Sequence, residues 1–320
     1  MKKSVLIVFL SVWFTSTIKS QFVSQFSQYM FSKETYNPAA LSQYNMITMN
    51  GIYKLQWVGI KDAPVDAVFH ASIPWSFHHQ NGNIGIALDN ESMGLLTKQE
   101  ATVQATYNFS LGSGTVSIGL NLGAVKVGFK GDSVHIPTGV FGNDYHIAAT
   151  SDPLIPTSQV NGMAFNAGIG LFYSTPSFYV GASGLNLTNP TIHWSSTQST
   201  YIGSMYYFMG GYNISTANPL IKIKPSILVK TNFIHVQEDI DLLVDYKNKF
   251  WGGLGYRPGD AFIINGGVHL DNGLTFGYAF DLPTTALGGS SFGSHELMVS
   301  YQFKLSLSKR HNKYKSVRIL

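Results

Sequence analysis

Three aspartates, Asp239, Asp241 and Asp245, alternate with aliphatic residues in the last third of the chain. Closely spaced carboxylates can bind Ca²⁺, but this run lacks the glycine turn and the terminal glutamate of a calcium loop. A spacing of two instead places all three side chains on one face of a β-strand. The pattern therefore favours a structural role for these charges over ion binding.

A run of lysines alternates with aliphatic residues in the segment just before the aspartates. In an antiparallel hairpin that closes near Ile234, Lys230 lies opposite Asp239. Lys224 then lies opposite Asp245. Opposite charges directly across two strands favour pairing. Charges that face lipid cost several kcal/mol, so the four residues are predicted to form a charge ladder inside a membrane-spanning wall.

Other chemistry-bearing residues show no catalytic spacing. The chain has no Cys, which removes thiolate zinc sites and cysteine nucleophiles, and its ten His are scattered. One long loop holds Asp132, His135, Asp144 and His146, which could meet around a metal, although mixed polar residues are usual in a long loop. The P-loop and the H-E-x-x-H motif are absent from the sequence. We predict no catalytic residue, cofactor or metal site, while a Ser-His-acid site built from distant residues stays an open alternative.

The composition indicates a membrane β-barrel. The chain has 32 Gly, 17 Tyr and 21 Phe, and only 12% of its residues are charged. A soluble domain carries about 25% charged residues. After residue 20 no apolar run reaches the length of about 18 residues that a spanning helix needs. A barrel wall needs little charge because its outer face touches lipid.

Alternating segments can be counted along the chain. In one of them Val116, Ile118 and Leu120 oppose Ser117 and Gly119. Fourteen such segments lie near residues 46–54, 65–75, 83–90, 100–110, 115–128, 160–174, 177–188, 200–214, 220–231, 238–247, 249–257, 260–270, 273–281 and 292–305. The pattern predicts an all-β fold, a transmembrane antiparallel β-barrel of fourteen strands.

The connections between these segments alternate in length. Even-numbered ones such as "LGSG", "STPS" and "DNG" are short, whereas odd-numbered ones include residues 128–159, 189–199 and 282–291. Among the predicted odd-numbered connections, only "RPGD" is short. Outer-membrane barrels have short periplasmic turns and longer outside loops, so the first strand is predicted to start on the periplasmic side. Pro225 cannot donate a ladder bond and predicts a bulge or weak pairing within its strand.

The ends of the chain are predicted to be separate segments. Residues 1–20 have a basic start, a short apolar run and small residues before Gln21, which is typical of a cleaved signal peptide. Residues 21–45 form a periplasmic segment that could plug the barrel, residues 46–305 form the outer-membrane barrel, and residues 306–320 form a basic tail. Residues 21–303 carry 12 basic against 17 acidic residues, so nucleic acid is not a predicted partner.

Several blocks of the sequence occur in the order found in a known family. They read "QFSQYMF…YNPAA", "KLQWVGIKDAP", "GNIGIALDNESMGLLTKQEATVQATYNF", "GIGLFYSTPSFYVGASGLNLTNP", "KNKFWGGLGYRPGDAFIINGGVHL", "GLTFGYAFD" and "GSHELMVSYQF". From about Gln25 to Lys304 the chain resembles the PorP/SprF family, outer-membrane proteins of the type IX secretion system and gliding machinery of Bacteroidota. The resemblance implies a non-enzymatic barrel in outer-membrane lipid that binds periplasmic ring or lipoprotein components, a secreted cargo protein or a surface adhesin.

The resemblance also points to two blocks as candidate partner-binding positions. They are Tyr36, Asn37 and Pro38 of the first block and Gln56, Trp57, Val58, Gly59, Asp62 and Pro64 of the second. Two other functions stay open on the sequence. One is an outer-membrane diffusion channel or hydrophobic-solute transporter, and the other is a membrane-embedded hydrolase.

Overall fold

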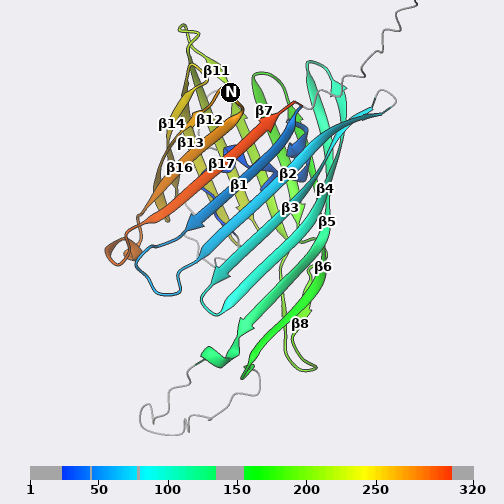
Figure 1. Ribbon diagram of the computed structural model, residues 1–320, viewed down its shortest axis with the longest axis vertical. Coiled ribbons are helices and arrows are strands. Elements are labelled where there is room, and N and C mark those ends of the chain that lie inside the picture. Colours follow the sequence, from blue (N-terminus) through cyan, green and yellow to red (C-terminus); the bar gives the residue numbers. More distant parts are fainter. Residues whose placement is uncertain (1–23, 44, 78–79, 135–154, 305–320) are drawn as a thin grey trace, which may run out of the picture.

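The protein is a closed barrel of fourteen antiparallel strands (Figure 1). The computed structural model describes residues 24–43, 45–77, 80–134 and 155–304. The predicted signal peptide, the basic tail after Lys304 and the candidate loop residues His135, Asp144 and His146 lie outside the described residues. The prediction of a fourteen-stranded antiparallel β-barrel is confirmed.

The barrel strands follow one another around the wall, and β1 pairs with β17 to close it. They are β1 (Ile47–Leu55), β2 (Val65–Phe77), β3 (Gln80–Met93), β4 (Leu96–Leu111), β5 (Gly114–Lys130), β6 (Gln159–Ser174), β7 (Phe178–Leu185), β10 (Met205–Tyr212), β12 (Ile221–Thr231), β13 (Val236–Tyr246), β14 (Phe250–Arg257), β15 (Ala261–His269), β16 (Leu274–Pro283) and β17 (Ser294–Phe303). Three short strands lie outside this cycle, namely β8 (Thr191–His193), β9 (Ser199–Tyr201) and β11 (Ile214–Ser215).

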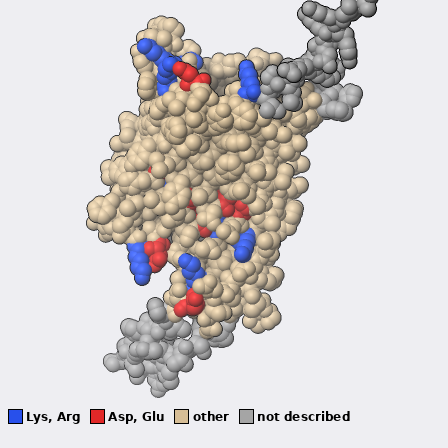
Figure 2. Space-filling model, in the orientation of Figure 1, with Lys and Arg blue, Asp and Glu red and all other residues tan. Residues whose placement is uncertain are grey.

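The two faces of the wall follow the alternation in the sequence. On β17, Leu297 and Val299 are exposed, whereas Glu296 and Ser300 are buried. On β5, Leu120 is exposed and Asn121 is buried. On the face drawn in Figure 2, most of the surface is free of charge, and few charged side chains appear across its middle. An apolar outer face around a polar interior is the arrangement of a barrel in lipid.

The connections differ between the two ends of the barrel. Residues 56–64, 131–158, 186–204 and 284–293 connect strands at one end, which we name the long-loop end and which lies lowest in Figure 1. The other end, the short-turn end, includes residues 112–113, 175–177 and 247–249. The expectation that only "RPGD" is a short odd connection is wrong, because β3 and β4 run on to a turn at Gly94 and Leu95, and residues 232–235 are also short.

Local chemistry explains two details of the wall. Lys247 and Asn248 both have positive φ, 57° and 50°, as the two central residues of a tight hairpin require. The pairing of β12 with β10 stops at Ser226, and pairing on that side resumes with β11 at Ile223. Pro225 falls in this gap, where the sheet needs no N–H donor from it. The expected weak pairing is therefore found on that side of the strand.

The chain before β1 lies inside the barrel. Three short 3₁₀ helices, η1 (Tyr29–Phe31), η2 (Lys33–Thr35) and η3 (Pro38–Gln43), are the blue coils visible behind β1 and β2 in Figure 1. We name residues 24–43 the luminal segment. Its apolar side chains, including Phe26, Tyr29 and Ala39, share one buried cluster with residues of the wall. Among the described residues no helix has the length and apolar character needed to cross a membrane.

Candidate functional site

The luminal segment contacts all fourteen strands of the barrel. Its partners run around the whole circumference: Asn50 and Lys54 (β1), His70 (β2), Glu91 (β3), Gln104 (β4), Gly119 (β5), Leu171 (β6), Ser183 (β7), Tyr207 (β10), Ser226 (β12), Gln237 (β13), Trp251 (β14), His269 (β15), Asp281 (β16) and Glu296 (β17). Short 3₁₀ helices have few internal hydrogen bonds, so the wall supplies most of the partners that fix this segment.

Two carboxylates of the wall hold the start of the luminal segment. Glu296 accepts the backbone N–H of Ser27 at 2.6 Å and that of Gln28 at 2.8 Å. The Ser27 hydroxyl donates to Asp281 at 2.6 Å, and the Lys54 ammonium donates to the Ser27 oxygen at 2.7 Å. Hydrogen bonds from backbone amides to a carboxylate are about twice as strong as neutral ones, so these contacts anchor the segment to β16 and β17.

The same carboxylates belong to a buried charge network. Its members are three cations, Lys54, Lys230 and Arg257, and four carboxylates, Asp239, Asp260, Asp281 and Glu296. Arg257 lies at the centre and pairs with Asp239, with Asp260 at 3.2 Å and with Asp281 at 3.4 Å. The carboxylates exceed the cations by one, and the backbone amides at Glu296 offset the excess. Buried charges persist only when they are paired in this way.

The predicted charge ladder forms two ion pairs, but in a different register. Lys230 lies 2.9 Å from Asp239, and Lys224 lies 2.9 Å from Asp245. The expectation that these residues face one another directly is wrong, because Lys230 is opposite Gln237, two residues before Asp239 on the partner strand. A shift of two residues keeps every side chain on its face, so the long lysine side chains reach their partners diagonally.

The first candidate block, Tyr36, Asn37 and Pro38, is buried against the wall. The Asn37 side-chain amide donates to the carbonyl of Leu171 at 2.9 Å, and its oxygen accepts the N–H of Ala39 at 2.9 Å. A Cβ on the nearby Gly170 of β6 would overlap the Asn37 side chain. The block therefore fixes the luminal segment to β6 and β7, and Asn37 has no exposed surface in this structure.

The second candidate block forms the connection between β1 and β2 at the long-loop end. Val58 donates its N–H to Gly293 at 2.8 Å and accepts from Phe292 at 2.7 Å, so the loop pairs with the connection before β17. The N–H of Trp57 donates to the Ser294 hydroxyl at 3.1 Å. Trp57 is half-buried, and Gly59 is exposed, so part of this loop is accessible at the long-loop end.

The other residues of the second block lie around the same loop. Asp62 accepts the N–H of Gly94 through its backbone carbonyl at 3.1 Å, which ties the loop to the turn between β3 and β4. The Gln56 side chain donates to Asp66 at 2.6 Å, and its backbone N–H donates to Pro64. The structure does not bring the two blocks together, because one is buried in the lumen and the other forms an outer loop.

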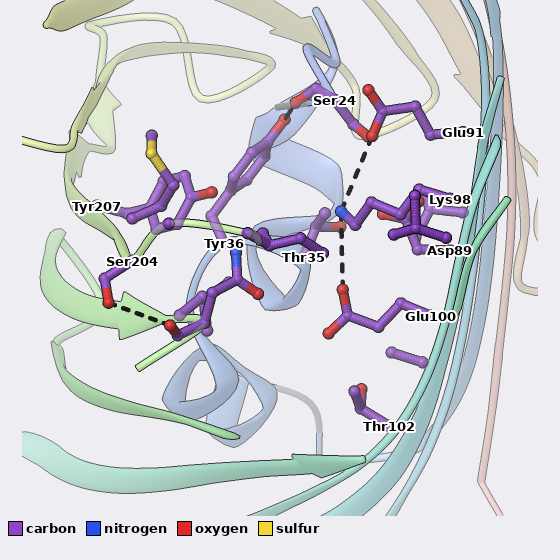
Figure 3. A pocket seen from close by; sticks show the side chains of 18 of the residues that line it. Ser24, Thr35, Tyr36, Asp89, Glu91, Lys98, Glu100, Thr102, Ser204 and Tyr207 are labelled. Carbon is purple, nitrogen blue, oxygen red and sulfur yellow. Dashed lines mark hydrogen bonds and ion pairs between the residues drawn. The ribbon is translucent and has the colours of Figure 1, made fainter. Parts of the chain in front are cut away.

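A cavity of about 450 Å³ lies between the luminal segment and the long-loop end. Its inner end is formed by Ser24, Thr35 and Tyr36, and its wall comes mainly from β3 and β4. Figure 3 shows Lys98 between Glu91 and Glu100, with Tyr36 and Tyr207 on the opposite side. Pockets of this size can enclose a small molecule or several residues of a peptide.

A family model matches nearly the whole described barrel and the luminal segment. The model is described as type IX secretion system membrane protein PorP/SprF, and it matches residues 18–301. The chain belongs to this family. Both candidate blocks, the charge network and the cavity lie within the matched residues, so these features belong to the part of the chain that the PorP/SprF model describes.

Other proteins add little to the PorP/SprF match. No curated protein matches the chain. Among solved structures, the toluene transporter TbuX of Ralstonia pickettii is 12% identical with a TM-score of 0.49, over 84% of this chain and 92% of that one. The monoaromatic hydrocarbon channel CymD is 12% identical with a TM-score of 0.49, over 90% and 95% of the two chains. Likeness at this level says nothing about what this PorP/SprF protein binds or transports.

Sequence reasoning missed most of the charge network of this PorP/SprF protein. Lys54, Arg257, Asp281 and Glu296 each stand on the inward face of a wall strand. The signal that could have found them is a charge at an inward position of a lipid-embedded wall, where charges are costly unless paired. In the described part of the chain, no group of three or more His, Cys, Asp or Glu has an arrangement suited to a metal.

Proposed function

We propose that this outer-membrane barrel of the type IX secretion family works by binding rather than by conducting solutes or by catalysis. It holds periplasmic components of the secretion machine at its short-turn end, and a secreted cargo protein or surface adhesin at its long-loop end. The observation that carries the proposal is the luminal segment, which touches every strand of the wall and is anchored by charge-assisted hydrogen bonds. A channel needs an open water-filled path, and this lumen is occupied by the chain itself.

The orientation of the barrel assigns a partner to each end. Outer-membrane barrels have their longer loops outside, so the long-loop end faces the cell surface in this proposal. The loop of Trp57 pairs with the connection that contains Phe292, and together they form an ordered surface there. Phe292 is 78% exposed, so its ring is accessible for a protein contact.

Co-purification from native membranes tests the proposal. An affinity tag on the full chain should recover a secretion component or a large surface protein after mild detergent extraction. Recovery of neither contradicts the binding function. A barrel unrelated to secretion, extracted from the same membranes, controls for nonspecific carry-over.

Conductance in planar bilayers tests the alternative, an outer-membrane diffusion channel or hydrophobic-solute transporter. The purified wild-type protein should give no large steady conductance. A variant that lacks residues 24–43 should conduct, because water then fills the space that the luminal segment occupies. A large steady conductance from the wild-type protein would count against a plugged binding barrel.

A further inference from the structure

The luminal segment forms the inner side of the cavity at the long-loop end. Ser24, Thr35 and Tyr36 of the luminal segment form that side, and Tyr36 is buried and packs on Tyr207 with ring centroids 5.4 Å apart. A solute that enters from the long-loop end therefore meets the luminal segment. The cavity therefore has the chain's own luminal segment as its inner boundary.

The lining of the cavity has more acidic than basic side chains. Asp89, Glu91 and Glu100 all line it, and Lys98 is the one Lys or Arg among its described lining residues. The Lys98 ammonium lies 3.8 Å from Glu91 and 3.7 Å from Glu100, longer than a close ion pair (Figure 3). Three carboxylates of the lining thus share one cation. A second cation would reduce the electrostatic repulsion between these carboxylates.

Two buried polar side chains of the lining have unmet hydrogen-bonding capacity. Gln104 is 3% exposed, and its amide donates to the Glu34 carbonyl at 3.1 Å, while Oε1 has no partner among the described residues. His70 is 4% exposed, and its Nε2 lies 3.0 Å from the Thr35 hydroxyl, while Nδ1 has no partner in the same set. An unpaired buried acceptor is costly, and the Gln104 oxygen can only accept. A ligand that brings several N–H donors and a positive charge satisfies both the carboxylates and this oxygen.

The mouth of the cavity exposes large apolar side chains. Tyr201 lines the cavity and is 73% exposed. Asn232 also lines it, and the next two residues, Phe233 and Ile234, are 72% and 78% exposed. A small cation would leave these side chains uncovered. An extended peptide that places one basic side chain in the cavity would cover them with its neighbouring residues.

We propose that the cavity binds a lysine or arginine side chain presented by an extended segment of a partner protein. This inference rests on the proposed binding function, and it names the chemistry of the contact at the long-loop end. Asp89, Glu91 and Glu100 face the cation, Gln104 accepts an N–H, and the mouth residues contact the flanking part of the segment.

Calorimetry on the full chain in detergent micelles tests the proposal. The probes are the capped peptide Gly-Tyr-Ser-Arg-Ser-Tyr-Gly, its twin with neutral citrulline in place of arginine, and the small cation agmatine. The arginine peptide should bind about 10- to 100-fold more tightly than the citrulline peptide, because charge-assisted contacts are lost in the twin. Agmatine should bind at least about tenfold more weakly than the arginine peptide, because it cannot cover the mouth.

Variants of the lining make the test specific. Glu100→Gln and Asp89→Asn should each reduce the preference for arginine, and Lys98→Met should increase it, a gain that structural damage does not produce. Asp271→Asn is the matched control, because Asp271 is exposed in the turn after β15 at the other end and pairs only with Lys249 among the described residues. Heat-modifiable mobility on a gel confirms that each variant is folded, and if one carboxylate variant does not fold, the other two variants decide.

Three results would overturn the proposal. They are equal binding of the two peptides, a preference for arginine that survives Glu100→Gln and Asp89→Asn, and agmatine binding as tight as that of the peptide. The last result would assign the cavity to a small cation instead of a protein segment. If partners still co-purify from native membranes in any of these cases, the proposed binding function is retained. Only the assignment of a basic side chain to this cavity is then rejected.

Discussion

Lys54 on β1 forms an ion pair with Asp281 on β16 across the intervening strand β17. The ammonium and the carboxylate oxygen lie 2.7 Å apart, and both side chains are almost fully buried. Glu296 of β17 stands between them, 3.4 Å from the same ammonium. Since β1 and β17 are the strands that close the barrel, this pair joins the two ends of the wall and also the luminal segment through Ser27.

Lys54→Met should destabilise the barrel strongly. The substitution keeps much of the side-chain volume but leaves Asp281 and Glu296 without their shared cation. Removing one partner of a buried pair costs about 3–5 kcal/mol, because the remaining charges stay buried with fewer partners. Urea unfolding in micelles, followed by tryptophan fluorescence, measures the loss in free energy of unfolding.

The matched control for Lys54→Met is Lys249→Met. Lys249 pairs with Asp271 at 3.1 Å, but both side chains are largely exposed. An exposed pair contributes about 0–1 kcal/mol, so this variant should unfold close to the wild type. Equal effects of the two variants would show that burial of the network does not matter.

Gly119→Val should loosen the luminal segment while leaving the wall intact. A Cβ at Gly119 would overlap the backbone of Pro38 and Ala39, which lie directly on this part of β5. Overpacking of this kind costs about 1–3 kcal/mol, so hydrogen exchange within residues 24–43 should become about tenfold faster or more. Exchange in the strands should change little.

Gly51→Val is the control for Gly119→Val. Gly51 also lies in a wall strand, but a Cβ there would meet only the Val68 carbonyl, at 3.9 Å. This variant should not alter exchange in the luminal segment. Equal acceleration by both variants would mean that glycine replacement in any strand loosens the segment.

The wall could be predicted from the sequence because its cause is local. Each strand alternates between lipid and lumen, so Leu297 and Val299 against Glu296 already indicate which way the strand faces. The register of the hairpin between β12 and β13 could not be predicted to the residue. It depends on where the turn closes, and the sequence offered several polar residues around Ile234 for that turn.

The site itself could be predicted only in part. Lys224 and Asp245 lie on adjacent strands, so their pairing follows from a hairpin alone. Lys54 and Asp281 are far apart in the sequence and meet only once the barrel closes at β1 and β17. The luminal segment has neither a helical nor a strand pattern, because the surrounding wall, rather than its own periodicity, fixes its conformation.

Trp57→Ala should weaken partner binding more than barrel assembly. Trp57 has a positive φ of 44°, and Ala in the same conformation has a similar conformational strain. The backbone N–H at this position keeps its hydrogen bond to Ser294. The variant therefore loses mainly a half-buried indole at the long-loop end. Interface tryptophans contribute about 2 kcal/mol or more, so recovery of partners from native membranes should fall at least about tenfold. Loss of the heat-resistant folded form on a gel would show that Trp57 is structural instead.

Lys33 makes the stability of the luminal segment depend on pH. Burial lowers the pKa of Lys33 from its ordinary value of 10.5 to about 8, against the opposing effect of Glu34. Its ammonium also lies 4.7 Å from the centre of the Tyr179 ring, a contact that favours the charged form and limits the cost. The unfolded chain binds this proton more tightly, so the cost of charging Lys33 is fully present below pH 8 and disappears as the pH rises from about 8 to about 10.5.

Lys33→Met should therefore be more stable than the wild type at pH 7, by about 1–2 kcal/mol. The gap should close towards pH 10.5, because the wild type then gains stability that the variant already has. Urea unfolding of both proteins across this range measures the gap, and Thr35→Val, an uncharged change in the same helix, should show a difference that does not vary with pH. A gap between Lys33→Met and the wild type that stays constant from pH 7 to pH 10.5 would show that Lys33 remains fully hydrated inside the barrel, and that the luminal segment does not exclude water around it.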